Sequence, residues 1–192
     1  MKMKLSNTTY FIITILLCGF IFGIYLSNYI QGNDLVNLNN SISTIATGTN
    51  QFEYLKSELV LGICLIIIIV LFATSFICTP LIGGIIFIKG VQIGYTCMLY
   101  LFTYQFKGII GIILTLLPQI ILDIAVIYII STIGIKLSLD VFKSVFYDIK
   151  VNIKYQINEL VNKIFICFIL TIASALIKSY VVVELIKWFT KL

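Results

Sequence analysis

The residues best suited to chemistry in this sequence are two charged side chains inside otherwise apolar runs. Lys89 and Asp123 stand in such runs, together with the polar residues Gln92 and Gln119. A charge at the centre of a membrane helix costs about 2.5–3.5 kcal/mol on insertion scales. At a rise of about 1.5 Å per residue, Lys89 lies about 12 Å and Asp123 about 18 Å from the same membrane surface. The long lysine stem closes much of that gap, so a Lys89–Asp123 pair is geometrically allowed.

Two interpretations of this pair are open. Buried charges often mark ion or proton pathways, but a relay normally needs several ionisable groups in line. The pair also suits a structural pin between two helices, or a Lys89 whose ammonium reaches the headgroups. We favour the structural interpretations. The chain has no histidine and no base placed beside its serines and threonines, so we predict that it is not an enzyme.

The composition requires that these residues be positioned by membrane helices. Hydrophobic residues make up 60% of the 192 and charged residues 11%, against about 25% charged in soluble domains. The five cysteines lie in apolar runs without the short spacings of a zinc site, so no metal and no cofactor is predicted. The lysines lie near the ends of the apolar runs and are not clustered on one face of the protein, which argues against nucleic-acid binding.

The apolar runs predict an all-α polytopic protein in which residues 1–192 form a single integral membrane domain. Transmembrane helices are expected over residues 8–30, 59–78, 81–104, 109–135 and 164–186. Pro118 should kink or break the fourth. Two glycine pairs at four-residue spacing, Gly19 with Gly23 and Gly90 with Gly94, predict close helix packing within the chain or with a partner.

Two segments between these spans are polar. Residues 31–58 form an acidic loop in which Leu35 and Leu38 begin the apolar spacing of a short helix lying on the membrane. Residues 136–163 are predicted to form a basic amphipathic interfacial helix. Two interpretations of this helix are open: it binds a partner or anionic lipid, or it simply lies at the lipid headgroups. We favour the second. The lysine distribution places the N-terminus and the basic helix in the cytoplasm and the acidic loop outside.

The order of several motifs resembles the stage II sporulation protein M family of endospore-forming bacteria. The residues that carry the resemblance are Lys89, Gly90, Gly94, Gly108 and the run Leu117, Pro118 and Gln119. The Cys-Gly-Phe-Ile-Phe-Gly run of the first span, the small polar loop and the length with five spans also suit that family. Asp123 departs from the pattern, because an apolar residue is expected there.

The resemblance implies a non-enzymatic membrane scaffold. Its expected partners are two membrane-anchored cell-wall hydrolases, the stage II sporulation proteins D and P, held at the mother-cell or septal membrane. Their peptidoglycan cleavage would thin the septum and drive forespore engulfment. The acidic loop, the turn at residues 104–107 and the glycine faces of the first and third spans are then the surfaces expected to meet partners. A permease-like subunit of an export system, with a polar path near Lys89 and Asp123, is the alternative.

Overall fold

The chain folds into a bundle of long helices, as predicted for an all-α polytopic protein. The computed structural model describes residues 3–29, 32, 34–37, 40, 51–75, 79–146 and 153–189. Over these ranges the backbone is helical apart from short turns and contains no strand. Five helical segments are long and apolar enough to cross a membrane: Asn7–Tyr29, Gln51–Ala73, Thr79–Tyr104, Phe106–Ser144 and Ile157–Ile186. The prediction of five spans is therefore confirmed.

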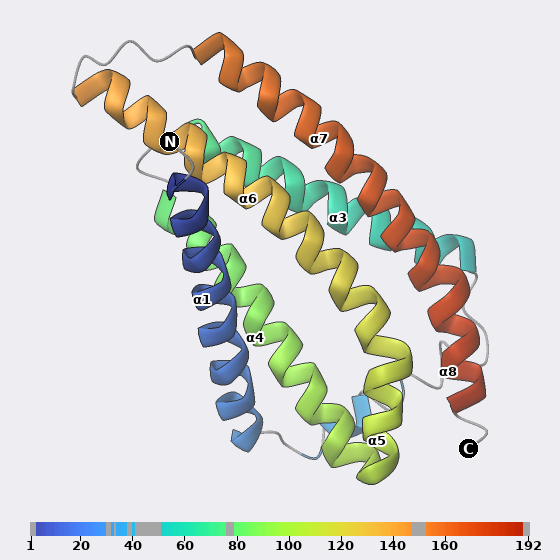
Figure 1. Ribbon diagram of the computed structural model, residues 1–192. Coiled ribbons are helices and arrows are strands. Elements are labelled where there is room, and N and C mark those ends of the chain that lie inside the picture. The colour runs from blue at the N-terminus through green and yellow to red at the C-terminus, as the bar shows by residue number, and fades with distance from the viewer. Residues whose placement is uncertain are drawn as a thin grey trace.

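The helices are arranged around α6. In chain order they are α1 (Met3–Leu26), α3 (Gln51–Ala73), α4 (Thr79–Tyr104), α5 (Phe106–Gly111), α6 (Leu117–Phe146), α7 (Ile153–Leu176) and α8 (Val183–Phe189). A 3₁₀ turn follows α1, and π-helical turns join α5 to α6 (Ile112–Leu116) and α7 to α8 (Ile177–Val182). Figure 1 shows α1 beside α4 on one side of α6, with α3 and α7 on the other. The buried core between them consists mostly of isoleucine, including Ile69, Ile82, Ile86 and Ile130.

The second span begins earlier than predicted. Helix α3 starts at Gln51, whereas the sequence placed residues up to 58 in the external loop. Glu53 lies in the first turn of α3, where a carboxylate interacts favourably with the helix dipole, so the charged residues extend the helix instead of ending it. Residues 34–37 are helical, as expected for the start of the short amphipathic helix, but most of that predicted helix lies outside the described residues.

The basic segment at residues 136–163 is not one interfacial helix. Helix α6 continues through Phe146 and α7 begins at Ile153, so the segment spans the end of one long helix and the start of the next. Its apolar positions divide: Leu160 belongs to the buried core and Val141 packs against it, whereas Phe146 and Ile157 are exposed. Lys136 and Glu159 form an ion pair of 2.8 Å between the two helices. The helical spacing predicted from the sequence is present within both helices, and part of the apolar face packs against protein.

The two glycine pairs pack against each other. We call Gly19, Gly23, Gly90 and Gly94 the glycine seam. A Cβ atom on Gly19 would overlap the carbonyl oxygen of Phe87, and one on Gly90 would overlap that of Leu16. Helices α1 and α4 thus approach backbone to backbone along their length. The expectation that the glycine faces of the first and third spans receive partner helices is wrong, because each face is occupied by the other.

A tight helical hairpin connects α4 to the fourth span. Gln105 adopts φ 50° and ψ −126°, and its carbonyl accepts a 2.9 Å hydrogen bond from the backbone N–H of Gly108. A Cβ on Gly108 would overlap the carbonyl oxygen of Tyr100, so only glycine lets α5 fold back this closely. The disruption expected at Pro118 takes the form of the π turn that ends at Leu116, two residues before this proline, which lacks a backbone donor.

The hairpin predicts a stabilising substitution. Gln105 occupies a region of φ and ψ that residues with a Cβ rarely adopt, so Gln105→Gly should raise the free energy of unfolding by about 1 kcal/mol. The measurement is thermal or denaturant unfolding of the purified protein in detergent. Thr103→Gly, two residues earlier in regular α4, is the control and should destabilise by about 0.3 kcal/mol, the difference in helix propensity between threonine and glycine. Equal loss of stability in both variants would contradict the strained turn.

Candidate functional site: a charged cavity within the bundle

A cavity of about 260 Å³ lies within the bundle, between the membrane-spanning helices. Its walls come from α1, α3, α4, α6 and α7 and from both π turns. The polar side chains that line it are Glu58, Lys89, Gln92, Thr96, Gln119, Asp123, Thr171, Ser174 and Lys178. The remainder of the lining is apolar, so these polar groups stand in a low-dielectric environment in which their electrostatic interactions are strong.

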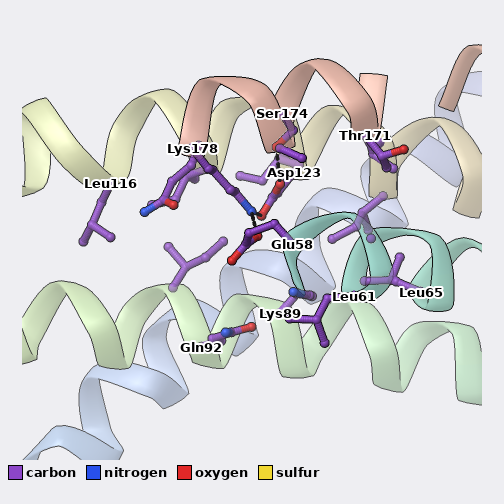
Figure 2. Close-up of a pocket in the computed structure, with 18 of the residues that line it drawn as sticks. Glu58, Leu61, Leu65, Lys89, Gln92, Leu116, Asp123, Thr171, Ser174 and Lys178 are labelled. Atoms are coloured by element: carbon purple, nitrogen blue, oxygen red, sulfur yellow. Dashed lines mark hydrogen bonds and ion pairs between the residues drawn. The ribbon is translucent and has the colours of Figure 1, made fainter. Parts of the chain in front are cut away.

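One lysine joins two carboxylates at the cavity wall. The ammonium of Lys178 donates to Glu58 Oε2 and to Asp123 Oδ2, each at 2.9 Å. Ser174 donates to the second oxygen of Asp123 at 3.0 Å. The side chain of Lys178 is 11% exposed, and those of Glu58 and Asp123 are 21% and 35% exposed. Figure 2 shows the three charged groups converging from α3, α6 and the π turn after α7. We call Lys178, Glu58 and Asp123 the ion triad.

Local backbone geometry places the triad. Lys178 is the second residue of the π turn Ile177–Val182, whose extra residue per turn rotates the side chains that follow it. Such single π turns within α-helices occur frequently at functional sites. Ser174 precedes Lys178 by one helical turn on the same face, which explains why both reach Asp123. Glu58 lies about 10 Å along α3 from its first residue, at a rise of about 1.5 Å per residue.

The facing wall of the cavity carries the other lysine. Figure 2 shows Lys89 and Gln92 on α4, across the cavity from the helices that carry Asp123 and Ser174. The predicted direct pair of Lys89 with Asp123 is not formed among the described residues: both line the cavity, but the carboxylate of Asp123 is engaged by Lys178 and Ser174. Lys178 therefore takes the place predicted for Lys89 as the partner of Asp123.

Sequence reasoning overlooked two members of this site. Lys178 stands inside the apolar run of the fifth span, so the criterion that singled out Lys89 also applies to it. Glu58 was placed in the external loop because the charges before it interrupt the apolar pattern. With both included, the cavity holds four ionisable groups, two lysines and two carboxylates, instead of one pair. Their formal charges cancel. Within the described ranges, no group of three or more potential metal-ligating side chains is found.

The motif residues of the sequence are distributed over three structural tasks. Gly90 and Gly94 belong to the glycine seam, and Gly108 permits the α4–α5 hairpin. Leu117 and Pro118 begin α6, directly after the π turn. The remaining two, Lys89 and Gln119, line the cavity. Residues of this one motif therefore serve both the packing of α1 against α4 and the lining of the cavity.

The sequence model of the stage II sporulation protein M family matches residues 12–182. The chain belongs to the stage II sporulation protein M family. The match extends over the glycine seam, the hairpin and every residue that lines the cavity. Membership and the five spans make the chain a multi-pass membrane protein of a sporulation family. No curated protein and no solved structure matches the sequence.

Proposed function

We propose that this member of the stage II sporulation protein M family is a non-enzymatic membrane scaffold of a peptidoglycan-degrading complex. The observation that carries the proposal is the family match over residues 12–182. The packing is consistent with a scaffold, because the glycine seam fixes α1 on α4 and the ion triad ties α3, α6 and the π turn after α7 together. Rigid spans of this kind can hold partners in place without taking part in chemistry.

The proposed partners are the membrane-anchored cell-wall hydrolases named stage II sporulation proteins D and P. The surfaces offered to them are the polar stretch between α1 and α3 and the α4–α5 hairpin. The C-terminal end of α1 and this hairpin lie at the same end of the bundle (Figure 1). Tyr95 donates a 3.2 Å hydrogen bond to Asp34, which anchors the polar stretch on α4. Phe106 at the hairpin is 86% exposed. With the glycine faces occupied, these polar and aromatic surfaces are the ones we propose for partner contacts.

Co-purification in sporulating cells tests this scaffold. Replacing residues 38–50 by a glycine–serine linker of equal length, together with Phe106→Ser, should reduce recovery of the two hydrolases at least tenfold and block engulfment. Lys136→Gln is the control, because it removes a charge about 28 Å along α6 from the first residue of that helix, at a rise of about 1.5 Å per residue. Membrane levels of each variant are measured by immunoblot. Undiminished co-purification after loss of both surfaces would refute the proposed contacts.

The proposed orientation has the N-terminus in the cytoplasm of the mother cell. Figure 1 places the N-terminus and the α4–α5 hairpin at opposite ends of the bundle, so the hairpin is then extracytoplasmic. A Gln105→Cys variant in a background without native cysteines should react with a membrane-impermeant maleimide in intact cells. Labelling only after membrane lysis would reverse the proposed orientation.

A permease-like role in an export system is the second candidate, and the cavity is the observation that favours it. Four ionisable groups inside a membrane bundle are the usual lining of a substrate or ion path. Substrate flux into proteoliposomes that disappears on Asp123→Asn would support transport and overturn the scaffold. An adjacent gene for an ATPase would point the same way, whereas neighbouring sporulation genes favour the scaffold.

A further inference from the structure

The cavity separates its charges between two walls. The ion triad contributes one lysine and two carboxylates, so its formal charge is negative by one. Lys89 on the facing wall supplies the balancing positive charge. Because the triad is held together by direct ion pairs and Lys89 forms an ion pair with none of its three members, the cavity presents an electronegative group and a separate electropositive group.

Each wall keeps hydrogen-bonding capacity that the described protein does not use. The side chains of Lys89, Gln92 and Gln119 make no hydrogen bond or ion pair with any described residue, although all three line the cavity. On the other wall, both oxygens of Asp123 are engaged, but Glu58 is engaged only through Oε2. The cavity thus offers an ammonium and two carboxamides on one side, and the second oxygen of Glu58 on the other.

We propose that this cavity binds a small zwitterion with an ammonium and an acidic group a few bonds apart. The ligand's ammonium would donate to Oε1 of Glu58, and its acidic group would accept from Lys89, with Gln92 and Gln119 as further donors. A simple anion is disfavoured because it would face the negative triad, and a simple cation because it would face Lys89. A zwitterion leaves the cavity neutral, which matters where water cannot screen an added charge.

The cavity volume limits the size of the ligand. At about 30 Å³ per water molecule, 260 Å³ corresponds to about nine waters. An amino acid with a small or medium side chain fits this volume, whereas a longer peptide does not. The headgroup of phosphatidylethanolamine is also a zwitterion of similar size. A lipid headgroup would enter beside Gln92, because this lining residue is exposed on the surface of the bundle. The site does not depend on the scaffold or on transport, because ligand binding is separable from both.

Equilibrium binding to the full chain in nanodiscs tests the proposal. The nanodiscs contain phosphatidylcholine and phosphatidylglycerol only, and the probes are alanine and glutamine, measured by calorimetry or scintillation proximity. N-acetylalanine lacks the ammonium and alaninamide lacks the carboxylate, so each should bind at least tenfold more weakly than alanine. Should the amino acids fail to bind, nanodiscs with added phosphatidylethanolamine test the headgroup source by native mass spectrometry of the retained lipid. Retention of this lipid over phosphatidylcholine would support the site with the lipid as ligand.

Variants connect the binding to the named residues. Lys89→Gln should weaken alanine binding, or phosphatidylethanolamine retention, at least tenfold, and Gln92→Leu should weaken it severalfold. Lys56→Gln is the control, because this lysine is exposed on α3 and does not line the cavity. Unfolding temperatures of all variants separate loss of binding from loss of fold. Equal binding of alanine and N-acetylalanine, unchanged binding by Lys89→Gln, or no binding of either class of zwitterion would each overturn the proposal.

Discussion

Gly90→Leu should disrupt the packing of α1 against α4 and destabilise the protein by about 3 kcal/mol or more, at or above the upper end of typical overpacking effects. A Cβ at this position overlaps the carbonyl oxygen of Leu16, and it also comes within 3.0 Å of the backbone nitrogen of Phe20. Backbone atoms in a helix cannot move aside as the end of a flexible side chain can. The two helices must therefore separate along the glycine seam, and the contacts on both sides of it are lost together.

Thermal unfolding in detergent, followed by circular dichroism and size-exclusion chromatography, measures this effect. Gly84→Leu is the matched control on the same helix, because a Cβ there meets no atom within 4 Å, and its unfolding temperature should stay close to that of the unchanged protein. Gly90→Ala tests the geometry more finely, since even one methyl group overlaps the facing backbone. If Gly90→Ala and Gly84→Ala were equally stable, the backbone contact along the seam would be excluded.

The glycine seam shows how far the sequence predicts the packing. Glycines four residues apart in an apolar run leave a groove on one helix face, which is visible without a structure. The sequence does not say which groove meets which, because the interacting pair is fixed by chain connectivity and by the shapes of all five spans. Here Gly19 opposes Phe87 and Gly90, and this pairing became apparent only from the structure.

The helix ends and the ion triad were less predictable for a different reason. Charged residues such as Glu53 and Glu58 lower the hydropathy of a window, so an apolar pattern ends before the helix does. The structure shows that these charges continue α3, and that Glu58 is satisfied by Lys178 from the fifth span. Because Glu58 and Lys178 lie 120 residues apart in the chain, no pattern of residue spacing in the sequence predicts their contact. The cavity follows from such contacts, whereas the five spans follow from composition alone.

The cavity also bears on how a scaffold and a ligand site can share one bundle. The triad ties α3 to α6 and to the end of the fifth span, while Lys89 lies on α4, the helix that the glycine seam fixes to α1. A ligand that joins Lys89 to Glu58 would therefore link these two groups of helices.

Lys178→Met should be the most damaging single change within the cavity. It leaves Glu58 and Asp123 without their shared counterion inside the membrane-spanning bundle, and loss of one partner of a buried pair typically costs about 3–5 kcal/mol. We expect a loss of about 3 kcal/mol, at the lower end of this range, because the side chain of Asp123 is 35% exposed and its charge is therefore only partly desolvated. Denaturation in mixed micelles measures the free energy of unfolding. Lys136→Gln breaks the more exposed pair with Glu159, and should cost less than about 1 kcal/mol.

The triple variant Glu58→Gln, Asp123→Asn and Lys178→Met decides why Lys178 matters. If the loss in Lys178→Met comes from two uncompensated carboxylates, removing both charges should restore stability to within about 1 kcal/mol of the unchanged protein, because neutral groups of similar shape often replace a buried ion network without loss. Failure of the triple variant to recover would instead assign the loss to the packing of the lysine stem in the π turn. Recovered stability together with loss of the alanine binding or phosphatidylethanolamine retention found for the unchanged protein would show that the triad's charges serve the ligand site, and that the fold requires only their balance.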